Sequence, residues 1–132
     1  MSNDTFSTWL SGLDFEFWST GQHKIDPPVF FEKWAKGEAV LLDVRAEEEK
    51  QFAVFPFALA IPINELPARL NEIPRDKLVV TFCSGGDRAN VAFAYLRTHG
   101  FENVRILKAA YPELMAELLP GKLRKTLQAK NG

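Results

Sequence analysis

The feature that most restricts the fold is a succession of three patterns in the second half of the chain. An apolar run is followed by an amphipathic helix pattern and then by a second apolar run. The two runs are residues 77–82 and 104–107. Between them, residues 88–99 carry apolar side chains at helical spacing, and Gly100 stands where a left-handed C-terminal cap is expected. Strand, helix and strand in this order form a βαβ unit, which predicts parallel strands.

Other patterns extend this prediction along the chain. Residues 39–43 are an apolar run that ends in an acid, which is typical of a buried central strand. Two consecutive prolines suit the first turn of a helix over residues 29–36, and a glycine follows at its end. Shorter helices are predicted at 46–51, 64–70, 111–119 and 121–128. We therefore predict an α/β fold with a small, mainly parallel central sheet flanked by helices on both faces.

The N-terminal region, residues 1–24, is rich in aromatic side chains and is predicted to be an extension of the main domain, residues 25–132. Its apolar residues up to Leu13 have helical spacing, whereas Leu13, Phe15 and Phe17 alternate as in a strand. We predict a short helix followed by an edge strand. Because large exposed apolar patches are rare on soluble monomers, the extension is expected to pack on the domain's own core, with a partner-binding surface as the alternative.

Length and charge limit the classes of protein to which the chain can belong. Its 132 residues suit a single domain, and 46% hydrophobic with 25% charged residues are ordinary globular proportions. Sixteen basic and seventeen acidic side chains give a net charge of −1, which predicts neither a nucleic-acid nor a membrane partner. The sequence shows neither an uncharged apolar stretch of about 20 residues nor a secretory leader, which indicates a cytoplasmic protein.

The single cysteine, Cys83, excludes an internal disulfide and a zinc site built from several thiolates, and no cofactor is predicted. Cys83 stands where a predicted parallel strand gives way to a helix, which is where open α/β sheets place their ligands. The loop continues with Ser84, Gly85, Gly86, Asp87 and Arg88.

The composition of this loop predicts a nucleophilic cysteine rather than an inert buried one. Two successive glycines let the backbone curl so that several N–H groups point at one atom. This cradle, the positive end of the following helix and the guanidinium of Arg88 all favour the thiolate of Cys83. The same donors could hold a persulfide sulfur or an oxyanion. His23 and His99 have no motif around them, so a cysteine-histidine hydrolase is unsupported.

A second constellation, Asp43-Val44-Arg45, ends the earlier predicted strand. If the two strands are parallel, it lies at the same edge of the sheet as Cys83. Arg45 is then a second cation at the pocket. The alternative is an acid that satisfies local backbone donors beside a surface arginine.

These residues resemble the single-domain rhodanese-like sulfurtransferases over residues 25–119. The resemblance rests on the loop 83–88 in its strand-to-helix setting, with supporting matches at 42–45, 56–58, 61–63, 100–104 and 107. It implies that the loop cysteine, here Cys83, takes sulfane sulfur from a donor such as thiosulfate, becomes a persulfide and passes the sulfur to cyanide or a thiol. A protein sulfur acceptor is a further partner that the resemblance allows. Residues 84–88 match the substrate-binding loop around the cysteine.

The chain also departs from the family pattern. Residues 53–58 lack both glycines and the histidine of the family's Gly-His-Ile-Pro-Gly-Ala, and residues 109–110 are alanines in place of a glycine pair. These changes affect the expected pocket shape. Asp87 adds a negative charge that would repel an anionic donor unless it points away or pairs with Arg88 or Lys108.

The leading functional prediction is a sulfurtransferase in which Cys83 carries the persulfide and Arg88 with Arg45 attracts the donor. One alternative is a rhodanese-like binding or regulatory module with little turnover, whose aromatic N-terminus serves a partner. The other is a cysteine phosphatase-like enzyme. The related phosphatases have one more residue between cysteine and arginine, so the shorter spacing here favours sulfur.

Overall fold

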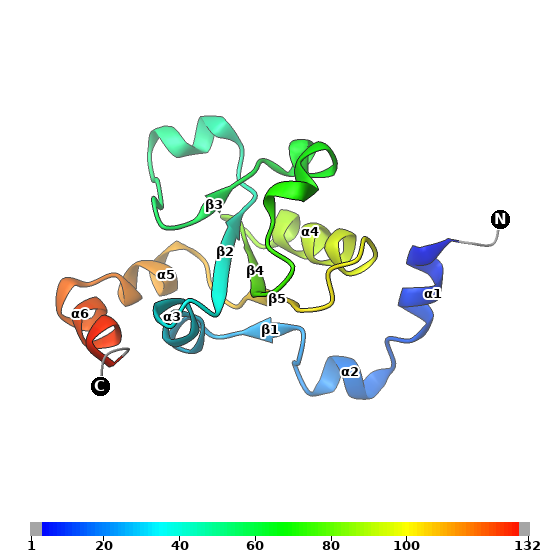
Figure 1. Cartoon of the computed structure of the whole chain (residues 1–132), viewed down its shortest axis with the longest axis horizontal. Coiled ribbons are helices and arrows are strands. Elements are labelled where there is room, and N and C mark those ends of the chain that lie inside the picture. The colour runs from blue at the N-terminus through cyan, green and yellow to red at the C-terminus, as the bar shows by residue number, and fades with distance from the viewer. Residues whose placement is uncertain (1–3, 130–132) are drawn as a thin grey trace.

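A computed structural model describes residues 4–129 and contains a five-stranded parallel sheet (Figure 1). The strands lie in the order β1-β5-β4-β2-β3, so that β4 is central and pairs with both β2 and β5. The predicted strands at 39–43, 77–82 and 104–107 are confirmed. The bounds are β1 Lys24–Ile25, β2 Ala39–Asp43, β3 Leu59–Ala60, β4 Leu78–Phe82 and β5 Val104–Leu107.

Side-chain alternation along the two central strands divides the interior into two cores. Leu42 of β2 and Val79 of β4 point into one core, and Leu41 and Val80 point into the other. Each of these side chains is at most 1% exposed. Because successive residues of a strand face opposite sides, a strand that is apolar throughout must be covered on both faces.

Helices cover both faces of the sheet, which confirms the predicted fold class. The 3-10 helix η2 and helix α4 line the core that contains Leu42, and α3 and α5 line the core that contains Leu41. The predicted helices at 46–51 and 64–70 are the tighter 3-10 helices η1 and η2. Within residues 4–129, no helix is both long and apolar enough to cross a membrane. The bounds are α3 Pro27–Ala35, η1 Glu47–Gln51, η2 Ile63–Glu72, α4 Asp87–Arg97, α5 Tyr111–Glu117 and α6 Pro120–Ala129.

The N-terminal region differs from its prediction in one element. Helix α1 (Thr5–Ser11) is present, but the predicted edge strand around Phe15 is wrong, because Phe15–Ser19 forms helix α2. Asp14 begins α2 by accepting a hydrogen bond from the Phe17 backbone N–H at 3.0 Å. This cap favours a helix over a strand, with Phe17 buried and Phe15 83% exposed. The edge strand is instead β1, which pairs with β5.

Aromatic rings attach the N-terminal helices to the rest of the domain. Trp9 of α1 meets Phe93 of α4 edge-on, with ring centroids 5.9 Å apart, and Phe17 stacks on His23 at 5.4 Å. Trp9, Leu13 and Phe17 join the core beneath α4. The division into residues 1–24 and 25–132 stays a prediction, and residues 1–3 and 130–132 lie outside the described residues.

Candidate active site

The carboxyl ends of β2 and β4 meet at one edge of the sheet. Asp43 is the register partner of Phe82, and the Val44 N–H donates to the Phe82 carbonyl oxygen at 3.0 Å. Cys83 follows Phe82 directly, and Arg45 follows Val44. The first residues of the two constellations, Asp43 and Cys83, are 40 positions apart in the chain. The fold brings them to neighbouring strand ends, because parallel strands end on the same side of the sheet.

The Cys83 side chain lies against backbone donors at the start of α4. Its Sγ accepts hydrogen bonds from the N–H groups of Gly86 at 3.0 Å and Ala89 at 3.3 Å. Gly86 has a φ of 96°, a left-handed conformation that a residue with a Cβ resists, whereas Gly85 does not have a positive φ. Cys83 is 2% exposed. Two backbone amides at the start of a helix are therefore directed at this buried sulfur.

Amides, rather than an imidazole, contact this sulfur in the part of the chain that the structure describes. His23 is buried and stacks on Phe17. His99 lies just beyond the C-terminal end of α4, stacked on Tyr95 with ring centroids 3.9 Å apart. This arrangement gives no support to a cysteine-histidine pair.

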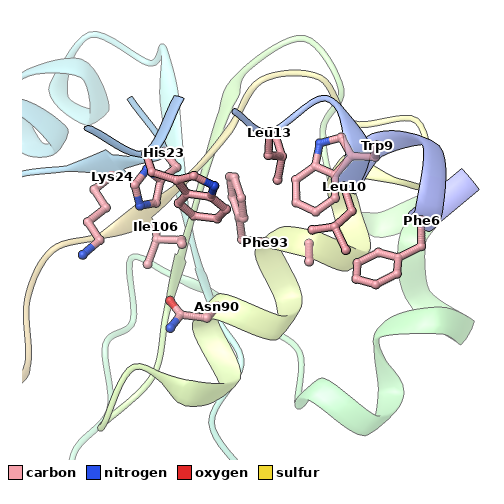
Figure 2. A pocket seen from close by; sticks show the side chains of 11 residues that line it. Phe6, Trp9, Leu10, Leu13, His23, Lys24, Asn90, Phe93 and Ile106 are labelled. Atoms are coloured by element: carbon pink, nitrogen blue, oxygen red, sulfur yellow. The ribbon is translucent and has the colours of Figure 1, made fainter. Parts of the chain in front are cut away.

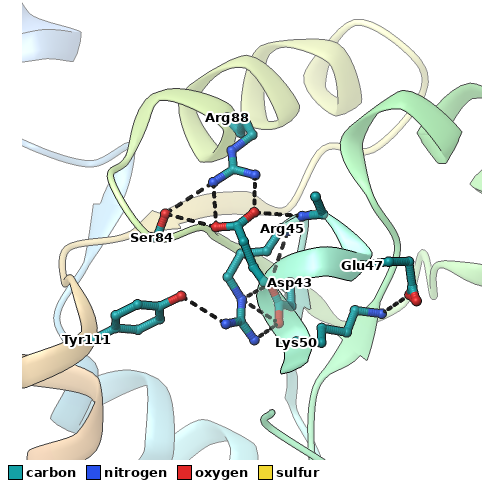
Figure 3. A network of polar contacts seen from close by, with 9 residues as sticks. Asp43, Arg45, Glu47, Lys50, Ser84, Arg88 and Tyr111 are labelled. Carbon is teal, nitrogen blue, oxygen red and sulfur yellow. Dashed lines mark hydrogen bonds and ion pairs between the residues drawn. The ribbon is translucent and has the colours of Figure 1, made fainter. Parts of the chain in front are cut away.

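Glu49 of η1 is a site residue that the sequence analysis missed. Nη2 of Arg88 donates to Oε2 of Glu49 at 2.9 Å while Nη1 donates to Oε1, and the Ser84 hydroxyl donates to Oε2 at 3.2 Å (Figure 3). The Ala46 N–H donates to Oε1 at 2.8 Å. These contacts, with the Arg88 hydrogen bond foremost, lower the pKa of Glu49 from 4.5 to about 2. Glu49 is the last of three consecutive glutamates, and their spacing gave no reason to choose one of them as a site residue.

The loop arginine is therefore paired with Glu49, not with the neighbouring Asp87. The hydrogen bond to Glu49 raises the pKa of Arg88, and charge attraction from Glu49 and Cys83 adds to this effect. Asp87 is exposed as the first residue of α4, where its carboxylate is close to the positive end of the helix. Arg88 thus ties the cysteine loop to η1.

Arg45 is fully buried and makes hydrogen bonds to Asp43, the last residue of β2. Its Nη2 donates to the Asp43 carboxylate at 2.8 Å, its Nε donates to the same group at 2.9 Å, and its Nη1 donates to the Tyr111 hydroxyl at 2.9 Å. The Phe55 ring centroid lies 4.8 Å from the guanidinium carbon. Burial alone would lower the pKa of Arg45, but the hydrogen bonds to Asp43 and Tyr111 raise it. The Asp43 carboxylate balances the positive charge of Arg45. That Arg45 attracts the sulfur donor stays a prediction.

A hollow of about 590 Å³ opens beside the cysteine loop. The loop glycines Gly85 and Gly86 line one side, and residues 106–110 line another. Two basic residues, Lys24 and Lys108, and one acidic residue, Glu113, are also among its lining residues. The sequence analysis did not assign Lys24 to the site, because only the pairing of β1 with β5 places it there. The balance of charge around the hollow favours an anion.

Fold and site together define a class: a parallel α/β domain with a cysteine loop at the carboxyl edge of its central strand. The chain belongs to the family of the rhodanese-like domain, whose model matches residues 29–117. A sulfurtransferase of Allochromatium vinosum is 37% identical over 87 residues, which are 65% of this chain and 81% of that protein. The resemblance to this family is confirmed.

Further similarities differ in how much of the other protein they cover. A tRNA uridine(34) hydroxylase of Cytophaga hutchinsonii is 33% identical over 90 residues, which are 64% of this chain but 28% of that protein. The solved structure of a human single-domain sulfurtransferase has a TM-score of 0.58 and 29% identity, and the match covers 74% of this chain and 98% of that one. The single-domain relatives therefore correspond to this chain over most of their length.

Proposed function

We propose that the protein is a sulfurtransferase in which Cys83 accepts and carries the transferred sulfur. The observation that carries this proposal is the pair of amide hydrogen bonds from Gly86 and Ala89 to Sγ, made at the carboxyl end of the central strand. The same two N–H groups are placed to hold an outer sulfur or an oxyanion bound at this position. Membership of the rhodanese-like family and the similarity to sulfurtransferases support the same reaction class.

The proposed cycle has two displacements. The Cys83 thiolate attacks the outer sulfur of thiosulfate, the new S–S bond forms, and the old S–S bond breaks with its electron pair leaving on sulfite. The product is a Cys83 persulfide anion, whose charge the loop amides hold. Cyanide or a thiolate then attacks the outer sulfur, forms thiocyanate or a new persulfide, and returns Cys83 to its thiolate.

The proposed donor site lies around the loop and the hollow beside it. Ser84, Arg88 and the loop amides offer hydrogen bonds to an oxyanion, and Lys24 and Lys108 add positive charge at the hollow. Glu49 already occupies hydrogen bonds of Arg88 and Ser84, so the donor must share them or displace the carboxylate. We expect Arg88→Ala to weaken the use of thiosulfate more than that of an uncharged persulfide donor.

Intact mass measurement tests the proposal directly. The reduced protein and Cys83→Ser are each incubated with thiosulfate, and their masses are recorded without reductant in the last step. We expect a gain of one sulfur atom on the parent alone. An equal gain on Cys83→Ser, or no gain on a parent whose thiol still reacts with iodoacetamide, would contradict the proposal for this donor.

A second candidate function is a binding or regulatory module with little turnover. The observation that favours it is that Cys83 is 2% exposed while Arg88 is already paired with Glu49. Thiocyanate formation from thiosulfate and cyanide separates the two functions. A rate that falls in Cys83→Ser supports the enzyme, whereas equal rates for parent and variant support the module.

A further inference from the structure

Two apolar faces on the surface of the molecule remain uncovered within residues 4–129. The first is the N-terminal face, formed by four side chains of α1 and α2 that are about half exposed or more: Phe6, Leu10, Phe15 and Trp18. The first two are four residues apart and the last two are three apart, so each pair lies on one side of its helix. Phe6 and Leu10 line an apolar cavity of about 360 Å³ that these helices form with α4 (Figure 2). Burial of this face against another apolar surface would be favourable.

The second is the C-terminal face, which runs along α6 and is formed by Leu119, Leu123, Leu127 and Pro120. The three leucines recur at every fourth residue, which places them on one side of the helix. Leu119 is 60% exposed. The other three residues of the face line a hollow of about 320 Å³. Exposed apolar patches of this kind mark contacts with another molecule.

The two faces carry opposite charge. Residues 4–23 contain neither lysine nor arginine but three acids: Asp4, Asp14 and Glu16. Helix α6 contains no acid but three basic residues: Lys122, Arg124 and Lys125. Lys122 pairs with Glu117 of α5 at 2.8 Å, whereas the other two basic side chains and the three acids form no ion pair in the part of the chain that the structure describes. Their charges are therefore available to a second molecule.

Figure 1 shows α1 and α6 at opposite ends of the longest axis of the molecule, so the N-terminal face does not reach the C-terminal face of its own chain. A second copy brings the two faces together. We propose that two copies of this chain form a dimer in which the N-terminal face of each copy packs on the C-terminal face of the other. Opposite charges favour this pairing over contact between two equal faces, in which like charges would meet.

The two contacts of this dimer are related by a two-fold axis, and the long axes of the two copies are antiparallel. This arrangement covers every face, whereas a head-to-tail chain of copies leaves one face open at each end. A stable interface buries at least about 1,000 Å² in total, so two small helical contacts formed together are better suited to it than one. Apolar burial supplies the affinity, and the charges fix the pairing and make it sensitive to salt.

Sedimentation velocity of the full chain tests the dimer, with a reductant present so that no disulfide links two copies. In about 50 mM salt, the mean mass of the parent should rise from 14.9 kDa towards twice that value between about 1 and 300 µM protein, and about 500 mM salt should weaken the dimer at least about fivefold. Phe15→Lys and Leu127→Glu each place the wrong charge on one face. Each should raise the dissociation constant at least about tenfold, because each variant alters both contacts of the dimer. The matched control is Phe52→Lys, at a ring outside both faces that is 88% exposed, and it should change the constant less than about twofold.

An equimolar mixture of Phe15→Lys and Leu127→Glu separates this pairing from its alternatives. A mixed dimer has one contact with two unchanged faces and one in which the introduced charges are opposite. The mixture should therefore associate at least about fivefold more tightly than either variant alone, which also shows that both variants are folded.

Three results would overturn the proposal. The first is a parent that stays at 14.9 kDa up to about 300 µM, including one that binds phosphatidylglycerol vesicles through α6 instead. The second is a Leu127→Glu variant that dimerises like the parent, because an N-terminal face that pairs with itself predicts this. The third is a mass that keeps rising beyond the dimer. None of these measurements involves sulfur transfer, so they leave the test of Cys83 with thiosulfate unaffected.

Discussion

Substitution of Glu49 by glutamine should destabilise the protein in a pH-dependent way. The carboxylate holds Arg88, Ser84 and the start of η1 together through four hydrogen bonds, and glutamine keeps the shape of the side chain but removes its charge. Because these contacts lower the pKa of Glu49, folding is favoured by its ionised form. The variant therefore isolates the contribution of one charge to the cysteine loop.

The size of the effect follows from the pKa. A decrease from 4.5 in the unfolded chain to about 2 in the folded protein corresponds to roughly 3 kcal/mol, at about 1.36 kcal/mol for each pH unit. The side chains of Arg88 and Glu49 are 33% and 28% exposed, so solvent screening reduces this value. We expect Glu49→Gln to lower the free energy of unfolding by about 1–2 kcal/mol at pH 7.

The direction of the pH dependence is fixed by the lowered pKa. The stabilising contribution is present above pH 4.5 and is lost as the pH falls towards 2, because the folded carboxylate then takes up its proton. The difference between parent and Glu49→Gln should shrink to less than about half of its neutral value by pH 3. Urea unfolding followed by tryptophan fluorescence at pH 7, 5, 4 and 3 measures it.

A neighbouring carboxylate provides the control. Glu48 lies in the same 3-10 helix and is exposed, and Glu48→Gln removes the same charge without touching the Arg88 contact. We expect it to change the free energy of unfolding by less than about 0.5 kcal/mol. A difference for Glu49→Gln that is equal at pH 7 and pH 3, or an equal loss in Glu48→Gln, would refute the reasoning.

Four further substitutions test the backbone of the cysteine loop and the packing of the domain. Gly86→Ala should cost about 1–2 kcal/mol and impair sulfur loading, because an L residue resists the φ of 96°, whereas Gly85→Ala should fold and load like the parent; urea unfolding and intact mass measure both. Tyr111→Phe should cost about 1–3 kcal/mol in urea unfolding by leaving a buried Arg45 donor without its acceptor, and no loss would contradict that hydrogen bond. Leu114→Ala should cost about 2–5 kcal/mol by opening a cavity in a fully buried position, measured in the same way.

The sequence by itself determined the layout of the chain and its reactive group. Apolar runs at residues 39–43, 77–82 and 104–107 predicted the central strands, because a parallel strand covered on both faces must be apolar throughout. Glycines and an arginine after Cys83 marked the strand-to-helix loop. These signals come from residues that are close together in the chain, so they can be recognised in the sequence without the tertiary structure.

Only the tertiary structure decided which groups face the cysteine and which face one another. The sequence does not distinguish Glu49 from the two glutamates before it, and only the fold pairs it with Arg88. Lys24 lines the hollow because β1 pairs with β5. The cap from Asp14 overrode an apparent strand alternation in favour of α2. The first two outcomes depend on contacts between segments that are far apart in the sequence. The third depends on a helix cap that outweighs a strand-like alternation of apolar residues, and the alternation alone does not show this.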